Sequence, residues 1–235
     1  MYTFESRIRY SEVDEKGMLT LKALCDYFQD CSSFQTHEMG IGIAKLKEKN
    51  LAFVITSWNM DINRLPNLGE KVYVKTAPYE VKGIFVKRSY LLESDKGEVL
   101  AAADSLWVLI DINTGKFATD SADVCLSCPL EKRVDVLEEP RKIKVKGDLK
   151  KEIPIIIERD LLDMNGHVNN VSYIDLASNF IPKEMIVCKL VVEYRKQAFL
   201  GEVLFPRTLE DGNEKLISFV NKDEEAYVNV KIIGR

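Results

Sequence analysis

Hydrophobic residues in the first part of the chain recur at helical spacing and then at the density typical of β-strands. Over residues 20–36 the apolar positions lie three or four apart, which predicts one helix with a wide buried face. This face consists of Leu21, Leu24, Cys25, Phe28 and Cys31. Runs rich in β-branched and aromatic residues then predict strands over residues 52–62, 71–81, 85–93 and 99–110. The charged run 45–50 between them is typical of a solvated helical face or a loop.

The second part of the chain repeats this order of elements. Val171 and Ile174 follow Asn170 at helical spacing, and Tyr173 and Ala177 extend the same apolar face, so a helix is predicted there. Strands are predicted over residues 153–158, 186–194, 202–209, 215–221 and 226–233. Strands that follow one another directly favour an antiparallel sheet, and one apolar helix per half must pack on it. The predicted fold class is therefore α+β.

A weak internal repeat relates the two halves. Each predicted helix follows a turn that contains Asp and Gly, and each half later contains a Leu-Gly-Glu segment after a strand. The matching residues are Asp14 with Asp163, Gly17 with Gly166, Asp26 with Asp175, and residues 68–70 with 200–202. We therefore expect two domains, an N-terminal one over residues 1–137 and a C-terminal one over residues 152–235.

The segment between the two expected domains, residues 138–151, is basic, contains Pro140 and Gly147, and has few residues suited to a core. Such a composition predicts a linker. Two interpretations remain open for it: a solvated connector, or a docking site for an acidic protein partner.

Composition narrows the class of protein. The chain is 46% hydrophobic and 30% charged with a net charge of −4, which is ordinary for a globular protein and gives no reason to expect nucleic acid as a partner. No run approaches the roughly 18 apolar residues of a membrane span. Residues 1–7 lack the basic and apolar regions of a secretory signal. We expect a cytoplasmic protein.

The five cysteines are scattered and odd in number, which favours a reduced protein. Cys125 and Cys128 have C-x-x-C spacing, but no second pair of ligands for a structural zinc ion follows. We expect neither a metal nor another cofactor. The role of the two thiols stays open, with ordinary loop cysteines as the default interpretation.

A carboxylate, an amide and an imidazole occupy alternate positions just ahead of the second predicted helix, at Asp163, Asn165 and His167. Asn169 or Asn170 is suited to be the N-cap of this helix. Unpaired N–H groups and the helix dipole favour developing negative charge at such a terminus, so the arrangement suits acyl chemistry. The simpler alternative is that Asp163, Asn165 and Asn169 only form turn and capping hydrogen bonds.

Two motifs resemble those of the plant and bacterial acyl-acyl carrier protein (ACP) thioesterases. Residues 163–174 are similar to the family pattern Asp-x-Asn-x-His-Val-Asn-Asn-x-x-Tyr, and residues 192–198 resemble its Glu-Tyr-Arg-Arg-Glu-Cys segment. The resemblance spans nearly the whole chain. It implies two tandem hotdog domains, each an antiparallel β-sheet wrapped around one long helix, of which the first shapes the acyl-chain pocket.

The resemblance also assigns chemical roles. Asp163, Asn165 and His167 match the catalytic residues of the family, while Lys16 and Met18 replace the Asn and His in the first half, so only the second site is expected to be competent. Gln197 and Ala198 stand where plant members have Glu and Cys, which removes a thiol nucleophile there and shifts more of the expected chemistry to Asp163. The supporting residues would be Gln197 and Asn169.

The implied activity is hydrolysis of the thioester of a fatty acyl-ACP in fatty acid biosynthesis, with acyl-bearing ACP as the partner. Asp163 would activate water or attack directly, His167 would share protons with it, and backbone N–H groups of Val168 and Asn169 would stabilise the oxyanion. An acyl-coenzyme A thioesterase of hotdog type and a non-catalytic acyl-binding hotdog protein are the alternatives. The expected assembly is a monomer or a homodimer. The preferred acyl chain length and branching stay open.

Overall fold

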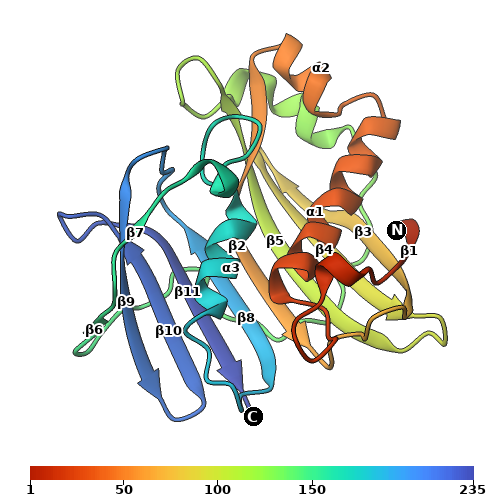
Figure 1. Ribbon diagram of the computed structural model, residues 1–235. Coiled ribbons are helices and arrows are strands. Elements are labelled where there is room, and N and C mark those ends of the chain that lie inside the picture. Colours follow the sequence, from red (N-terminus) through yellow and green to blue (C-terminus); the bar gives the residue numbers. More distant parts are fainter. The chain divides into compact units, whose positions relative to one another are not determined.

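A computed structural model describes residues 1–235 of the chain and every side chain apart from that of Ala122. The chain divides into two compact units, each with its own helix and strands (Figure 1). The first unit comprises Met1–Thr56 and Met60–Leu137, and the second comprises Ser57–Asn59 and Glu138–Arg235. The predicted α+β class is confirmed. No helix in the described part of the chain is long and apolar enough to cross a membrane.

The first unit contains a sheet with the strand order β1-β3-β4-β5-β2. Neighbouring strands from β1 to β5 in this order run antiparallel. The four strands predicted after the helix are confirmed to within one residue at each end. The elements of the unit are β1 (Tyr2–Arg7), α1 (Leu21–Glu38), α2 (Ile43–Glu48), β2 (Leu51–Ile62), β3 (Lys71–Lys82), β4 (Phe85–Ser94), β5 (Val99–Asp111), and 3-10 helices over Tyr10–Glu12 and Thr119–Leu126.

Helix α1 forms because a capping residue precedes a broad apolar face. The Thr20 hydroxyl accepts a hydrogen bond from the Ala23 N–H at 3.1 Å and so satisfies one free amide of the first turn. All five residues of the predicted face are buried. The Phe28 ring lies 5.2 Å from that of Tyr90 on β4, and the Cys31 thiol donates to the Val74 carbonyl on β3. The helix therefore packs on the sheet of its own unit.

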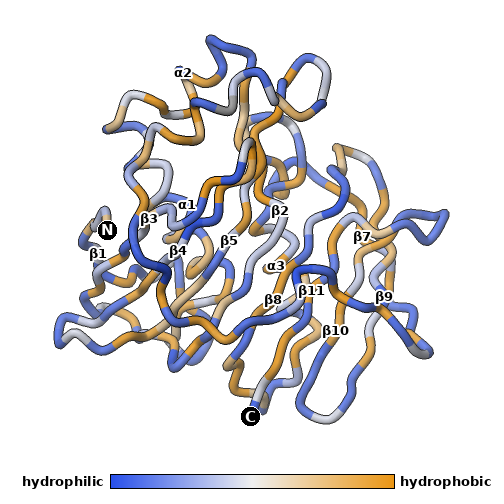
Figure 2. Tube along the Cα trace, turned by 180° about the vertical axis from the view of Figure 1, so that it is seen from behind, coloured by the Kyte–Doolittle hydropathy of each residue, from blue (hydrophilic) through white to orange (hydrophobic). Residues whose placement is uncertain are grey.

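The second unit has the strand order β8-β11-β10-β9-β6, in which all neighbours run antiparallel, and β7 also pairs with β9. Most hydrophobic stretches lie along the longer strands, and most of the connecting turns are hydrophilic (Figure 2). The elements of the unit are β6 (Lys150–Lys151), β7 (Ile155–Ile156), a 3-10 helix (Arg159–Leu161), α3 (Asn170–Ser178), β8 (Val187–Tyr194), β9 (Val203–Asp211), β10 (Glu214–Val220) and β11 (Ala226–Gly234).

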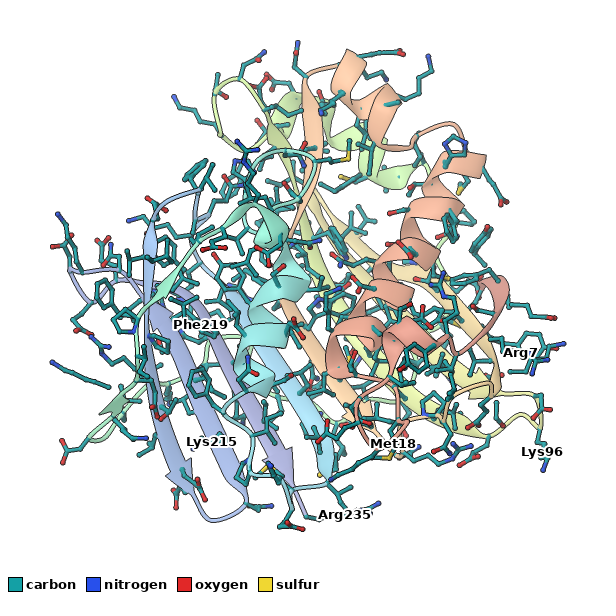
Figure 3. All side chains as sticks on the ribbon, viewed as in Figure 1. Arg7, Met18, Lys96, Lys215, Phe219 and Arg235 are labelled. Atoms are coloured by element: carbon teal, nitrogen blue, oxygen red, sulfur yellow. The ribbon has the colours of Figure 1, made fainter. Side chains whose placement is uncertain are left out.

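Helix α3 is only nine residues long, against eighteen in α1, so the expectation of one long helix holds for the first unit alone. Its N-cap is Asn169, whose side chain accepts from the Val171 N–H at 3.3 Å. The rings of Tyr173 and Phe219 lie 5.8 Å apart, and Phe219 extends from β10 on the side of the sheet that α3 covers (Figure 3).

Two segments of the second unit differ from their predictions. The predicted strand 153–158 shortens to Ile155–Ile156, because Pro154 has no N–H to donate to a ladder. The predicted linker 138–151 lies along the sheet of the second unit. Its last two residues form β6, and its alternating residues Ile143, Val145 and Leu149 are partly buried. In the sequence, the lysines between these apolar residues make the segment look like a uniformly basic linker.

The same turn precedes the helix in both units. In the first, one Asp14 carboxylate oxygen accepts the N–H groups of Lys16 and Met18, and the Gly17 N–H donates to the Asp14 carbonyl. In the second, Asp163 repeats these three hydrogen bonds with Asn165, His167 and Gly166. Both turn glycines adopt the left-handed region, with φ of 75° at Gly17 and 79° at Gly166. The internal repeat seen in the sequence is thus a repeat of hydrogen bonds.

We expect Gly17→Ala and Gly166→Ala each to lower the free energy of unfolding by roughly 1–2 kcal/mol, because an L-residue is strained at these φ values. An added Cβ meets no atom within 4 Å at either position, so the cost is conformational and not steric. Urea denaturation of the two variants measures it. Asn tolerates the left-handed region and serves as the control substitution. Equal losses with Ala and Asn would contradict this explanation.

Candidate active site

The two sequence motifs meet at the turn ahead of α3. His167 pairs with Phe199 through an isolated β-bridge, and the Val168 N–H donates to the Ala198 carbonyl at 3.0 Å. The turn thereby lies against the β8–β9 connection, which carries Gln197 and Ala198. The corresponding bridge in the first unit joins Met18 to Asn67.

Asp163 is held by its own turn. Its Oδ1 accepts the N–H groups of Asn165 at 2.8 Å and His167 at 3.2 Å, and its Oδ2 accepts from the Asn165 side chain at 3.3 Å. The structure thus brings the carboxylate and the amide together. Since Asp14 makes the same backbone bonds in a unit without the Asn and His, these bonds belong to the turn rather than to chemistry.

His167 is the titratable side chain of the turn that remains available. Its imidazole is half-buried and makes no hydrogen bond or ion pair with any described residue. The Phe199 ring packs edge-on against it, with centroids 5.0 Å apart and planes at 70°. The aromatic contact restricts the orientation of the imidazole while leaving both ring nitrogens free to exchange a proton with a substrate or water.

The two backbone amides predicted to stabilise an oxyanion are not free. Val168 donates to Ala198, and Asn169 donates to the Leu161 carbonyl at 2.8 Å. The prediction for these two donors is therefore corrected: both are used to fix the turn, as Leu19 and Thr20 are in the first unit. At the start of α3, the N–H of Asn170 donates to no described acceptor. A helix amide without an acceptor is the kind of group that binds an anion.

The two predicted supporting residues have different surroundings. The Asn169 side chain caps α3 and is thereby occupied by a structural bond. Gln197 is exposed, and its side chain makes no hydrogen bond with a described residue. The neighbouring Ala198 is fully buried. No structural contact therefore holds the Gln197 amide toward His167.

Sequence reasoning placed Tyr173 on an apolar face and missed its hydroxyl. The residue is only 2% exposed, and its phenolic oxygen has no hydrogen-bond partner among the described residues. Burial raises the pKa of this phenol, and the nearby Tyr227 and Glu202 raise it further, so the group stays a protonated donor. Tyr173 lies one turn after Asn170, on the same face of α3. No pattern in the sequence distinguishes an unpaired buried hydroxyl from a paired one.

The cysteines supply no replacement for the missing thiol. The second unit contains one cysteine, Cys188, whose Sγ donates to the Ile233 carbonyl near the start of β8, whereas Ala198 follows the end of that strand. Cys125 and Cys128 are free thiols in the first unit, and burial raises the pKa of Cys125 to about 11. Such a thiol is a weak nucleophile near neutral pH.

Two family profiles match this chain. The acyl-ACP thioesterase N-terminal domain matches residues 1–126, and the acyl-ACP thioesterase C-terminal domain matches residues 144–232. The fold and the polar turn ahead of α3 agree with this assignment. The chain belongs to the acyl-ACP thioesterase family.

Curated relatives extend the comparison. The chain is 27% identical over 224 residues to a chloroplastic acyl-acyl-carrier-protein hydrolase of Cuphea viscosissima. It is 26% identical over 219 residues to a chloroplastic oleoyl-acyl carrier protein thioesterase of Arabidopsis thaliana. These alignments cover 88% and 84% of this chain but 54% and 60% of the relatives. The chain thus spans about half the length of the curated relatives it matches.

Solved structures show the same fold. An acyl-ACP thioesterase from Bacteroides thetaiotaomicron superposes with a TM-score of 0.90 at 24% identity, over 99% of this chain and 97% of that chain. The 12:0-ACP thioesterase from Umbellularia californica gives a TM-score of 0.82 at 19% identity, over 100% and 96%. The predicted hotdog fold, with one antiparallel sheet and one central helix in each unit, is confirmed.

We expect Tyr173→Phe to raise the free energy of unfolding by roughly 1 kcal/mol or more, because it removes a buried hydroxyl that has no partner. Tyr194→Phe is the matched control, since the Tyr194 hydroxyl donates to the Asn170 carbonyl at 2.9 Å and its loss should destabilise the protein. Thermal and urea denaturation of both variants without ligand measure the difference. A destabilised Tyr173→Phe variant would show that the hydroxyl is bonded.

Proposed function

We propose that this chain hydrolyses the thioester of a fatty acyl-ACP and releases a free fatty acid and holo-ACP. The observation that carries the proposal is the difference between two turns with the same hydrogen bonds. The second turn presents Asn165 and His167 where the first presents Lys16 and Met18. A protein that only bound acyl groups would have no use for polar groups confined to one of two matching turns.

In the proposed reaction, His167 is the general base. The neutral imidazole takes a proton from water as the water oxygen bonds to the thioester carbon. The resulting tetrahedral oxyanion is stabilised by the Asn170 N–H, with the Tyr173 hydroxyl one turn further along α3 as a second donor. The C–S bond then breaks, and the imidazolium returns its proton to the leaving thiolate. One water is consumed, and a carboxylic acid and a thiol are formed.

Asp163 and Asn165 have positioning roles in this proposal. Because Oδ1 of Asp163 already accepts two N–H groups, this carboxylate holds the backbone of His167 in place. Its negative charge also stabilises a nearby imidazolium as the proton moves. Direct attack by Asp163 is the less favoured role, because three hydrogen bonds withdraw electron density from the carboxylate.

The acyl-ACP hydrolase and oleoyl-ACP thioesterase relatives support ACP as the carrier and a fatty acyl chain as the substrate. The family assignment over both halves of the chain supports the same substrate class. The five free cysteines support a reducing compartment such as the cytoplasm. This location agrees with a role in fatty acid biosynthesis.

We expect His167→Ala to lower kcat for acyl-ACP about 10²- to 10⁴-fold, the usual contribution of a general base. Asp163→Asn keeps an acceptor for the turn amides but removes the charge, so kcat should fall with little loss of stability. Met18→Ala and Asp14→Asn are the matched controls in the first unit and should leave kcat nearly unchanged. Steady-state release of free thiol measures all four variants.

The same assay separates the alternatives when it uses ACP and coenzyme A thioesters of graded chain length. Preference of the wild type for coenzyme A would make the protein an acyl-coenzyme A thioesterase. Absence of hydrolysis with every substrate would favour an acyl-binding protein. Near-normal turnover by both His167→Ala and Asp163→Asn would falsify the proposed site.

A further inference from the structure

A strip of positive charge crosses the second unit. It consists of six residues in the segment that the sequence analysis predicted as a linker, and we call it the basic strip: Arg141, Lys142, Lys144, Lys146, Lys150 and Lys151. All six are exposed. Six of the 33 lysines and arginines of the chain thus lie within eleven consecutive residues, in a protein whose net charge is −4. The positive charge is concentrated in one place.

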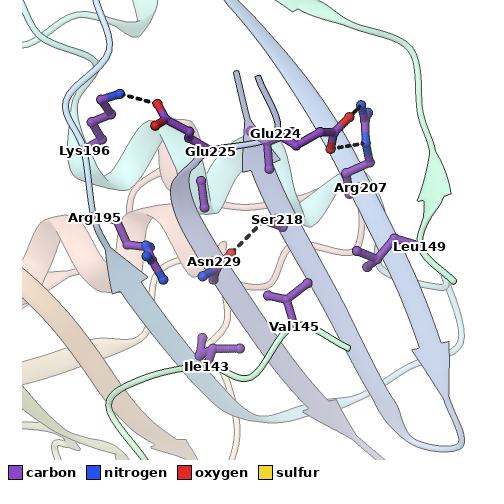
Figure 4. Close-up of a pocket in the computed structure, with 12 residues that line it drawn as sticks. Ile143, Val145, Leu149, Arg195, Lys196, Arg207, Ser218, Glu224, Glu225 and Asn229 are labelled. Atoms are coloured by element: carbon purple, nitrogen blue, oxygen red, sulfur yellow. Dashed lines mark hydrogen bonds and ion pairs between the residues drawn. The ribbon is translucent and has the colours of Figure 1, made fainter. Parts of the chain in front are cut away.

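The outward orientation of the central lysines follows from a two-residue alternation. Ile143, Val145 and Leu149 are partly buried and line a cavity of about 640 Å³ above the sheet, together with Asn229 and Ser218 (Figure 4). In an extended chain the residues between them point the opposite way. Lys142, Lys144 and Lys146 are therefore held on the solvent side, roughly 7 Å apart.

The segment is fastened to the sheet at several points. Before the strip, Glu139 forms an ion pair with Lys231 at 2.6 Å. Within it, the Ile143 N–H donates to Oε2 of the nearly buried Glu193 at 3.1 Å. At its end, Lys150 and Lys151 pair with β9. A partner would therefore meet charges whose backbone is already ordered, which lowers the entropic cost of association.

The sheet surface beneath the segment is lined by polar side chains, most of which hydrogen-bond to one another. Glu193, Asn229, Ser218 and Arg207 occupy one cross-strand row over β8, β11, β10 and β9, and each is at most 8% exposed. The Ser218 hydroxyl donates to Asn229 at 2.7 Å, and the Asn229 amide donates to Glu193 at 3.1 Å. This row anchors the covering segment through Glu193.

Little negative charge offsets the strip. Lys150 pairs with Glu152 at 3.0 Å, but the other five members form no ion pair with a described residue. Other nearby carboxylates are those of Asp148, and of Asp211 and Glu214, which line a hollow of about 350 Å³ with Lys142, Lys144 and Lys146. Glu139 lines the same hollow but is paired with Lys231, and Glu224 interacts with Lys151 but is paired with Arg207. Five of the six strip cations thus stay outside any ion pair with a described residue. Neighbouring strip charges lie within about one Debye length at physiological salt, so their potentials add.

The strip is connected to the candidate active site through β8. Ile143 is bonded to Glu193, which lies five residues before Ala198, a span of at most about 17 Å in an extended chain. Ala198 accepts the Val168 N–H in the turn that carries His167. Arg195 and Lys196 follow β8 directly and line the same cavity as Ile143 (Figure 4). Both are in ion pairs, Arg195 with Glu193 at 3.7 Å and Lys196 with Glu225 at 2.6 Å, and they precede Gln197 and Ala198 in the chain.

We propose that the basic strip is the docking surface for the acidic carrier protein whose thioester the second unit hydrolyses. The proposal rests on the proposed function. A macromolecular anion is required because the charges are spread along eleven residues rather than gathered in a pocket. A folded acidic protein suits them better than nucleic acid, since the two hollows beside the strip can receive side chains and the chain as a whole is acidic.

The test reverses the charge of the strip centre with Lys142→Glu, Lys144→Glu and Lys146→Glu in one variant of the full chain. Lys47→Glu, Lys49→Glu and Lys116→Glu form the control, because these exposed lysines of the first unit also lack ion pairs with described residues. The substrates are one acyl chain on ACP and the same chain on N-acetylcysteamine, which carries no charge.

For the strip variant we expect KM for acyl-ACP to rise about tenfold or more, with kcat and the hydrolysis of the N-acetylcysteamine thioester unchanged. The salt dependence of kcat/KM for acyl-ACP should flatten, while the control variant behaves as the wild type. Equal KM values for the strip and control variants would overturn the proposal. Loss of binding to anionic vesicles with unchanged KM for acyl-ACP would overturn it in favour of a lipid surface.

Direct binding separates this proposal from the proposed function. Calorimetry with holo-ACP at low salt should show binding to the wild type and the control variant and at least a tenfold weaker affinity for the strip variant. That binding result supports the docking surface even if the protein hydrolyses no thioester. In that case the proposed function would fail and the docking surface would stand. Hydrolysis of acyl-ACP with equal holo-ACP affinity for all three proteins would reject the docking surface alone.

Discussion

The capture of two backbone N–H groups by one carboxylate oxygen organises each unit of this protein. Asp14 and Asp163 close their turns in this way, and the glycine that follows allows the chain to reverse direction. The turn sets where the helix starts, because the next residues, Thr20 and Asn169, are its N-caps. It also presents its last side chain, Met18 or His167, to the strand connection across the bridge. Loss of this interaction would displace the helix start and the candidate base together.

Duplication separates the structural part of this turn from its chemical part. The first unit keeps the carboxylate and the glycine but has lysine and methionine where the second has asparagine and histidine. The second unit also buries a Tyr173 hydroxyl that has no hydrogen-bond partner among the described residues. A buried donor without a partner costs about 1–3 kcal/mol, so this hydroxyl on the helix that follows the candidate base is consistent with a group kept for a substrate.

In the proposed function, electrostatic interactions of the second unit act over two distances. In the proposed reaction, hydrogen-bond donors of α3 act on the thioester carbonyl over a few ångströms. On the other face of the sheet, exposed lysines act over about a Debye length and need no exact fit. The buried row from Glu193 to Arg207 holds the covering segment in place. A carrier protein could thus be attracted by charge before its acyl group is positioned.

The local pattern of hydrophobic residues was sufficient to predict the helices and strands. The burial of Leu24 and Phe28 follows from helical spacing, and β10 and β11 pair because they are consecutive along the chain. The sequence by itself also determined the family motifs, the repeat and the residues of the polar turn. Only the tertiary structure decided which groups of that turn are free. The amides of Val168 and Asn169 are occupied because their acceptors, Ala198 and Leu161, come from other segments, and the Tyr173 hydroxyl is unpaired because none reaches it. Hydrogen-bond satisfaction depends on partners distant in sequence, and no local pattern records them.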